Sequence, residues 1–217
     1  MSSWLQRTQD QLEGILRLAP VVAVVTIERA EDAVPLARAL VAGGIPAIEV
    51  TLRTPVAIDA IEMIAKEVDG AVVGAGTVLT AEDLHSAERA GARFAVAPGA
   101  SPALLQAAEH SAVPFLLGAA TASEAMMFLE RGFRLLKFFP AEPAGGVEYL
   151  RALSGPLPAI RFCPTGGVRP ETAPNYLALP NVVCVGGSWL TPANRVQAAD
   201  WDGITALARA AAALRRG

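Results

Sequence analysis

Lysine is scarce in this sequence, and one lysine lies inside an apolar segment. Lys and Arg together number 18 in 217 residues, yet only Lys66 and Lys137 are lysines. Lys137 belongs to "RLLKFFPAE" (134–142), which has the composition of a buried strand. Burial lowers the pKa of an ammonium, and a neutral amine can attack a ketone or aldehyde to form a Schiff base. The alternative is a structural lysine that pairs with a core carboxylate.

A carboxylate and an arginine lie close together in a second apolar segment, "AIEVTLRTP" (47–55). The alternation of a strand places Glu49, Thr51 and Arg53 on one face. In a barrel strand that polar face turns toward the lumen. There Glu49 could move protons and Arg53 could hold a substrate carboxylate with two parallel hydrogen bonds. A structural ion pair between Glu49 and Arg53 is the alternative, and the two roles are compatible.

Glycines follow several apolar runs, notably in "PTGGV" (164–168) and "VGGSW" (185–189). Backbone amides at such positions can approach a phosphate, and the last two strand ends of a TIM barrel frequently bind one. Two tight turns with positive φ are the alternative. "GAGT" (74–77) is no dinucleotide fingerprint, because the third glycine would fall at Leu79. It predicts a turn that offers amides and the Thr77 hydroxyl to an anion.

Metal chemistry is not expected from the pattern of possible ligands. His85 and His110 lie in helical stretches, and no Cys, His or Asp cluster has ligand spacing. A metal held by Glu49 is the less favoured alternative, and we expect no cofactor. Cys163 and Cys184 lie in apolar runs and are expected to be buried thiols rather than a disulfide.

Eight short apolar runs must position these residues. They begin at Val21, Ala47, Ala71, Phe94, Pro114, Leu135, Ile160 and Val182. Helical patterns lie between them, with predicted starts at Thr54-Pro55, Ser101-Pro102 and Thr191-Pro192, and at a capping box from Thr121 to Glu124. The alternation predicts an α/β fold, a (β/α)₈ TIM barrel, rather than a doubly wound sheet. We expect one domain over residues 1–217, with an extra N-terminal helix over residues 1–19 packed on the barrel.

Composition excludes several partners. The net charge of −3 and the absence of a basic cluster argue against nucleic acid. Although hydrophobic content is 53 %, no apolar run approaches the roughly 20 residues that a membrane span requires. The first residues resemble an amphipathic helix rather than a secretory signal. A cytoplasmic protein is therefore expected.

Five dispersed motifs together resemble one family. "EVTLRTP", "VGAGTVL", "LKFFPAE", "RFCPTGG" and "GGSWL", in this order, closely resemble the bacterial 2-keto-3-deoxy-6-phosphogluconate aldolases, also called 4-hydroxy-2-oxoglutarate aldolases. The likeness runs from about Pro20 to the C-terminal helix. It implies a homotrimeric (β/α)₈ class I aldolase without a metal, which cleaves the six-carbon keto-acid phosphate into pyruvate and glyceraldehyde 3-phosphate in the Entner-Doudoroff route.

The resemblance also implies residue roles. Lys137 would form the Schiff base with the C2 ketone, and Glu49 would act as general base and acid. The pyruvate carboxylate would bind Arg53, Thr77 and the backbone around Pro98. The remaining roles are phosphate binding by Gly166, Gly167, Gly187 and Ser188, and shaping of the pocket by Phe139 and Thr165.

Two departures from the family pattern concern substrate preference. The family often has basic residues where this chain has Glu28 and Arg29, and proline where it has Leu117. The first could weaken attraction for a dianionic substrate, and the second could reshape the loop after the fifth strand. Thr165 resembles the branch of the family that acts on the gluconate substrate rather than on its galactonate epimer, so the resemblance implies the gluconate substrate. An isomerase or epimerase on the same barrel and a phosphosugar-binding module without turnover are the alternatives from other classes.

Overall fold

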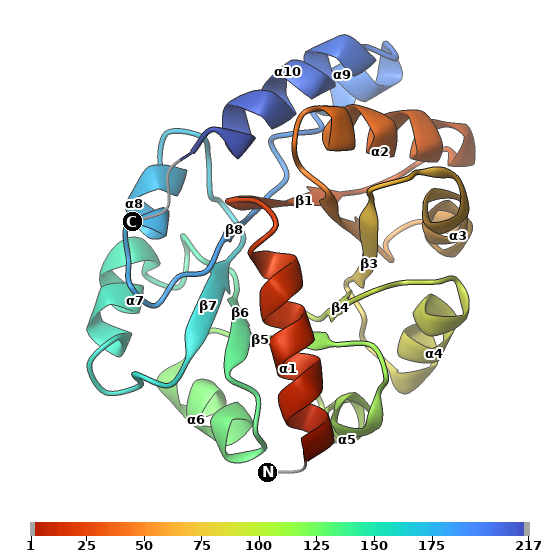
Figure 1. Cartoon of the computed structure of the whole chain (residues 1–217). Helices are drawn as coiled ribbons and strands as arrows, with labels where there is room; N and C mark the ends of the chain where they lie inside the picture. Colours follow the sequence, from red (N-terminus) through yellow and green to blue (C-terminus); the bar gives the residue numbers. More distant parts are fainter. Residues whose placement is uncertain (1–2, 215–217) are drawn as a thin grey trace.

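The protein folds as a ring of parallel strands surrounded by helices (Figure 1). The structure is a computed structural model that describes residues 3–214. Within them, eight strands follow the order β7-β6-β5-β4-β3-β2-β1-β8, and parallel bridges Phe162–Val182 and Thr165–Gly186 bring the two ends of this sheet together. The strands are β1 (Val21–Val25), β2 (Ala47–Thr51), β3 (Val72–Gly76), β4 (Ala95–Val96), β5 (Phe115–Ala119), β6 (Leu135–Phe138), β7 (Arg161–Pro164) and β8 (Val185–Gly187). The predicted TIM barrel is confirmed as a nearly closed barrel.

Helices connect successive strands and cover the outside of the ring (Figure 1). They are η1 (Ala30–Asp32), α2 (Ala33–Ala42), α3 (Ala57–Glu67), α4 (Ala81–Arg89), α5 (Pro102–His110), α6 (Ala122–Glu130), α7 (Gly146–Leu153), α8 (Ala173–Leu177), α9 (Ala193–Gln197) and α10 (Trp201–Ala212). Each predicted apolar run contains a strand, although β8 begins at Val185 rather than at Val182. None of the helices in the described part is long and apolar enough to cross a membrane.

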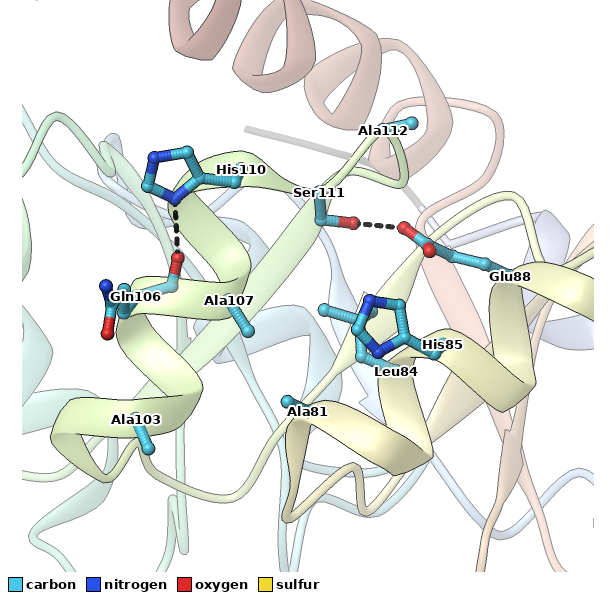
Figure 2. Close-up of a pocket in the computed structure, with 10 residues that line it drawn as sticks. All are labelled: Ala81, Leu84, His85, Glu88, Ala103, Gln106, Ala107, His110, Ser111 and Ala112. Carbon is cyan, nitrogen blue, oxygen red and sulfur yellow. Dashed lines mark hydrogen bonds between the residues drawn. The ribbon is translucent and has the colours of Figure 1, made fainter.

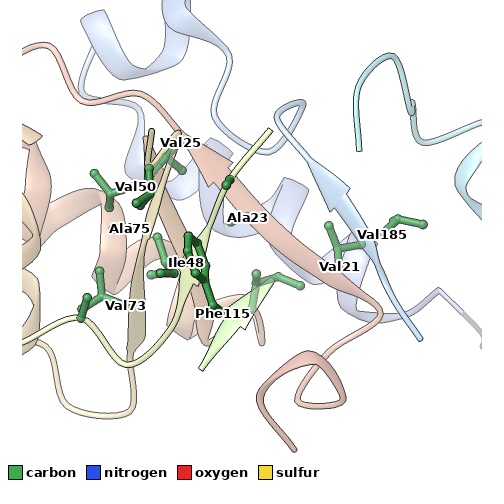
Figure 3. Close-up of a cluster of buried hydrophobic side chains, with 14 of the residues drawn as sticks. Val21, Ala23, Val25, Ile48, Val50, Val73, Ala75, Phe115 and Val185 are labelled. Atoms are coloured by element: carbon green, nitrogen blue, oxygen red, sulfur yellow. The ribbon is translucent and has the colours of Figure 1, made fainter. Parts of the chain in front are cut away.

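Outward-facing side chains of the strands form the main core. Ile48 and Val50 alternate with Ala47, Glu49 and Thr51 along β2, as a strand between a lumen and a helical layer requires. Figure 3 shows members of this core, which include Val21, Ala23, Val25, Ile48, Val50, Val73, Ala75, Phe115 and Val185. Full burial of one Val or Ile side chain contributes about 1.5–3 kcal/mol, so this layer holds the helices on the strands.

The helix α1 (Ser3–Leu16) covers one end of the ring (Figure 1). Its Leu12 and Leu16 are buried against lumen-facing residues of the strands. This cluster also contains Ile15, Val22, Ala47, Phe94, Val96, Leu116, Leu135, Cys163, Val183 and Cys184. The Gln9 side chain accepts hydrogen bonds from the backbone amides of Arg134 and Leu135, both at 3.0 Å. Because these contacts lie at the start of β6, α1 closes the N-terminal end of the lumen, and the C-terminal strand ends lie opposite.

The local signals for helix starts were right only in part. Ser101 caps α5, and the Thr121–Glu124 capping box begins α6, as predicted. The predicted start at Thr54-Pro55 was wrong, because α3 begins at Ala57 and the Thr54 hydroxyl donates to the Ile27 carbonyl oxygen at 2.6 Å. A tertiary contact thus replaces the cap. The start at Thr191-Pro192 was also wrong, since Pro192 itself precedes α9 and no side chain caps that helix.

Candidate active site

A lysine and a glutamate meet inside the lumen. Lys137 on β6 donates a hydrogen bond to Glu49 Oε1 on β2, with 3.2 Å between nitrogen and oxygen. The two residues are only 4 % and 3 % exposed. The ammonium also lies 5.1 Å from the centroid of the Phe139 ring, within the range of a cation–π contact. A proton can therefore pass directly between amine and carboxylate in a site with little access to water.

Glu49 pairs with Lys137, and this corrects one of the sequence-based alternatives. The strand β2 ends at Thr51, so Arg53 lies in the turn beyond it and the alternation argument does not reach it. Arg53 is exposed and its Nε donates to Thr77 Oγ1 at 3.0 Å. A structural ion pair between Glu49 and Arg53 was therefore the wrong alternative. Thr51 instead links two strands, because its hydroxyl donates to the Val25 carbonyl oxygen at 3.1 Å.

Arg53 and Thr77 form a polar pair at the ends of β2 and β3. Thr77 follows Gly76 and has a φ of 57°, which is unusual for a residue with a branched side chain. Strained backbone of this kind is frequent at functional sites. The guanidinium and the hydroxyl therefore lie together at the C-terminal end of the barrel. Both groups can donate hydrogen bonds to a carboxylate.

Two glycines permit close approaches next to the lysine and the glutamate, one by the Glu49 side chain and one by the Pro98 backbone. A β-carbon on Gly76 would lie 2.3 Å from Glu49 Oε1. A β-carbon on Gly118, the neighbour of Lys137 in the ladder, would lie 2.2 Å from the Pro98 carbonyl oxygen. Sequence reasoning did not single out either glycine as a site residue. Glycine inside a strand often marks a close approach of this kind and could have indicated them.

The ends of β7 and β8 bring the predicted phosphate-binding residues close together. Thr165 and Gly186 form a parallel bridge, and a β-carbon on Gly186 would lie 2.2 Å from Thr165 Oγ1. Gly166 and Gly167 follow with φ values of 102° and 84°, in the region that favours glycine. The Phe139 ring packs next to this turn, 3.2 Å from where a β-carbon on Gly166 would lie. Gly187 is buried at the end of β8, and Ser188 is exposed directly after it.

The two departures from the family pattern have different surroundings. Glu28 and Arg29 line a cavity of about 350 Å³ together with Ser188. The Arg29 guanidinium binds Asp32 with two hydrogen bonds of 2.9 and 2.7 Å, so a neighbouring carboxylate balances its charge. Leu117 lies inside β5 among the outward-facing core residues. Leu117 is therefore part of the strand and not of the loop after β5, and its effect on that loop stays a prediction.

Both histidines lie on helices outside the ring, as their sequence context predicted. Figure 2 shows His85 on α4 and His110 on α5 on the two sides of a cavity of about 570 Å³. The His110 ring is hydrogen bonded to the carbonyl oxygen of Gln106 at 2.9 Å. Across this cavity the Ser111 hydroxyl donates to Glu88 at 2.7 Å. Among the described residues, no three His, Cys, Asp or Glu side chains gather closely enough to hold a metal ion.

Comparisons with known proteins agree on one family. Residues 12–207 match the family model described as KDPG and KHG aldolase. A relative from Escherichia coli (strain K12), named KHG/KDPG aldolase, is 50 % identical over 211 residues, which cover 97 % of each chain. The crystal structure of the 2-keto-3-deoxy-6-phosphogluconate aldolase of Zymomonas mobilis ZM4 with 3-phosphoglycerate is 47 % identical, with a TM-score of 0.92 over 97 % of this chain and 98 % of that chain.

A second solved structure shows reaction chemistry in a similar protein. The KDPG aldolase from Legionella pneumophila is 46 % identical, with a TM-score of 0.91 over 93 % of this chain and 98 % of that chain. In that structure pyruvate was captured at low pH as a covalent carbinolamine intermediate. Such an intermediate requires an amine nucleophile. The present chain belongs to the KDPG and KHG aldolase family.

Proposed function

We propose that this protein is a class I aldolase that cleaves 2-keto-3-deoxy-6-phosphogluconate into pyruvate and glyceraldehyde 3-phosphate. The observation that carries the proposal is the buried hydrogen bond between Lys137 and Glu49 at the catalytic end of the lumen. In the Legionella relative, pyruvate forms a covalent carbinolamine. Lys137 is the buried amine of this chain that could form the equivalent bond.

The pair supplies the proton transfers that formation of the Schiff base requires. Glu49 takes the ammonium proton of Lys137 across the 3.2 Å contact, which leaves a neutral amine. The amine attacks the C2 ketone and forms a carbinolamine. Glu49 gives the proton to the carbinolamine hydroxyl, which leaves as water, so that an iminium ion and the Glu49 carboxylate remain. The iminium withdraws electrons from C3, so the bond between C3 and C4 becomes weak.

Cleavage and release follow from the same two residues. The Glu49 carboxylate removes the C4 hydroxyl proton, the bond between C3 and C4 breaks, and its electrons enter the enamine as glyceraldehyde 3-phosphate leaves. Glu49 then returns that proton to C3. Hydrolysis of the resulting iminium releases pyruvate and restores Lys137. One carboxylate can perform both transfers because it takes the proton in one step and returns it in a later one.

The mouth of the barrel holds the two charged ends of the substrate in this proposal. Arg53 and Thr77 bind the carboxylate next to C2, with the backbone at Pro98 on the neighbouring strand end. The phosphate binds the amides of Gly166, Gly167 and Gly187 and the Ser188 hydroxyl, with Phe139 and Thr165 shaping the pocket between. Positive φ values at Gly166 and Gly167 support this arrangement, since such turns expose successive amides to anions.

Substrate preference follows the names of the relatives. We propose the gluconate compound as the main substrate, with 4-hydroxy-2-oxoglutarate as a second one that lacks the phosphate. The comparisons do not favour the galactonate epimer, or an isomerase or epimerase on the same barrel. The proposed reaction needs no metal and no cofactor. One barrel domain over residues 1–217, a homotrimer and a cytoplasmic location remain predictions from the sequence.

Reduction with borohydride in the presence of pyruvate tests the proposed mechanism. Reduction converts an iminium into a stable secondary amine, so a peptide that contains Lys137 should gain the mass of a reduced pyruvate group. Lys66 is the matched internal control, because it is exposed on α3 and paired with Glu62. An unmodified Lys137 at saturating pyruvate would refute the Schiff base. Retained turnover of a phosphosugar by Lys137→Arg would favour an isomerase or epimerase instead.

A further inference from the structure

A buried tyrosine and a carboxylate lie beneath the glycine turn after β7. Tyr176 on α8 is fully buried, and its hydroxyl donates to Glu142 Oε1 at 2.9 Å. A buried phenol hydroxyl needs such a partner. Burial is the main cause that raises the pKa of Tyr176 above its ordinary value, and the hydrogen bond to Glu142 raises it further. The hydroxyl therefore stays protonated and remains a donor.

The Glu142 side chain is packed directly against Gly167. A β-carbon on Gly167 would lie 2.8 Å from both Cβ and Cγ of Glu142. On its other side, the Glu142 carboxylate lies 3.7 Å from where a β-carbon on Gly146 would be, and the Tyr176 hydroxyl lies 3.3 Å from the same point. The start of α7, the turn after β7 and α8 therefore meet at this one carboxylate.

Backbone hydrogen bonds from the same segment orient the two glycine amides. The Glu142 amide donates to the Gly166 carbonyl oxygen at 3.0 Å, and the Ala141 amide donates to the Thr165 carbonyl oxygen at 2.8 Å. In a planar trans peptide the carbonyl and the next N–H group point in opposite directions. The bonds therefore direct the N–H groups of Gly166 and Gly167 away from residues 141 and 142. A displaced Glu142 would turn these amides.

We propose that Tyr176 and Glu142 are positioning residues that hold the Gly166–Gly167 turn in the geometry that binds the substrate phosphate. The proposal rests on the function proposed above and deepens it, because it separates phosphate recognition from cleavage. Tyr176 fixes the Glu142 carboxylate, and the Glu142 side chain and amide fix the turn. In the described structure no hydrogen bond or ion pair joins either residue to Lys137 or Glu49. Loss of the support should therefore affect phosphorylated substrates alone.

Steady-state kinetics with two substrates test this separation. Tyr176→Phe removes one buried hydrogen bond, so we expect KM for the phosphorylated substrate to rise on the order of tenfold at nearly unchanged kcat. KM for 4-hydroxy-2-oxoglutarate should stay within about twofold, because that substrate has no phosphate. Glu142→Ala should show the same split. Glu142→Gln should stay near wild type, since its amide oxygen can accept the Tyr176 bond.

Tyr149→Phe is the matched control. It makes the same chemical change at the other tyrosine, whose hydroxyl accepts a hydrogen bond from the Ala122 amide at 3.2 Å instead of bonding to Glu142. Both KM values should be unchanged. Equal changes for both substrates, no change in Tyr176→Phe, or an effect of Glu142→Gln equal to that of Glu142→Ala would overturn the proposal. If Tyr176→Phe does not fold, Glu142→Ala at its exposed position decides.

Binding of 3-phosphoglycerate distinguishes failure of this inference from failure of the proposed function. Calorimetry measures its affinity without any cleavage, and Tyr176→Phe should weaken it by the same factor, on the order of tenfold. If the wild type binds 3-phosphoglycerate but cleaves neither substrate, the aldolase proposal fails and the positioning role is decided by the binding data. If the wild type does not bind it, the phosphate site and the positioning role both fail.

Discussion

The two ends of the barrel lumen are built from the same strands but differ in chemistry. At the end that α1 covers, Ala47 and Leu135 belong to an apolar cluster with Leu12. Two residues further along the same two strands, Glu49 and Lys137 form a hydrogen bond. Leu135 is 1 % exposed and Lys137 is 4 % exposed, so burial is nearly equal. Residue chemistry, and not solvent access, distinguishes the structural end from the catalytic end.

This difference separates stability from reactivity along each strand. A buried ion pair adds little net stability, because the loss of hydration offsets most of the attraction between the charges. The apolar layer under α1 has no such cost and stabilises the barrel. The open end can therefore keep Lys137 and Glu49 in a dry setting that favours their chemistry. Gly76 and Gly118 lower the stability of the catalytic end further, because glycine in a strand loses more conformational freedom on folding than other residues do.

The largest expected effect is on Lys137, the proposed nucleophile. Lys137→Arg keeps a positive charge beside Glu49 but removes the amine, so pyruvate release should fall on the order of 10⁴-fold or more. A coupled assay for pyruvate measures this loss, and borohydride should no longer attach pyruvate to this position. Lys66→Arg is the control and should retain full activity, because Lys66 is exposed. Substantial pyruvate release by Lys137→Arg would show that the chemistry of the catalytic end does not depend on the amine of Lys137.

Glu49, the proposed general base, should have the next largest effect. Glu49→Gln can still accept a hydrogen bond from Lys137 but cannot take or return a proton, so kcat should fall about 10²- to 10⁴-fold. Exchange of the pyruvate methyl protons in heavy water, followed by NMR, reports formation of the pyruvate iminium and proton transfer at C3 without cleavage of the bond between C3 and C4. It should slow by a similar factor. Exchange at the wild-type rate in Glu49→Gln would assign that step to another group. Glu62→Gln, at an exposed glutamate of α3, is the control and should exchange at the wild-type rate.

The structural end should respond in stability alone. Leu12→Ala opens a cavity between α1 and the lumen, so the free energy of unfolding should fall by about 2–5 kcal/mol. Urea unfolding measures this change, and kcat per folded molecule should remain within about twofold. Leu18→Ala, at a leucine that is 49 % exposed, should change stability by less than about 0.5 kcal/mol. A large loss of kcat in Leu12→Ala would show that the two ends are coupled.

The strands could be predicted from the sequence because each is a short apolar run between turn residues. Local signals were less successful where a distant contact intervenes. The Thr54 hydroxyl donates a hydrogen bond to the Ile27 carbonyl oxygen, so it does not cap a helix. The eighth run begins at Val182, but Val182 makes only an isolated bridge to Phe162, and the regular ladder to β1 starts at Val185. Such pairing depends on the closed ring and has no signal in the run itself.

The site could be predicted as a set of residue types but not as a set of partners. Glu49 and Lys137 are 88 positions apart, and nothing local indicates that they meet. The strand alternation, extended beyond its end at Thr51, placed Arg53 on the same face as Glu49, and the ion pair offered as an alternative there does not form. The support of the glycine turn by Tyr176 was missed for the same reason, since it joins residues of α8 and the loop after β6.

The smallest expected effect concerns a loop at the catalytic end. Burial alone would raise the pKa of Glu124, but hydrogen bonds from the Ala120 amide and from the hydroxyl and amide of Thr121 lower it below its ordinary value of 4.5. These bonds hold the connection from β5 to α6. Glu124→Gln should therefore cost on the order of 1 kcal/mol in the free energy of unfolding near pH 7.

The pH dependence of this cost gives a sharper test. A carboxyl with a lowered pKa in the folded protein stabilises it above its unfolded pKa, and this stabilisation is lost as the pH falls through the folded pKa. The difference between wild type and Glu124→Gln should therefore be constant above pH 5 and shrink below about pH 4.5. Glu130→Gln, which makes the same chemical change at the other end of α6 and away from the capping box, is the matched control. A difference that persists at pH 3 would mean that the glutamate acts through packing, and the catalytic end would then resemble the structural end more closely than its charges suggest.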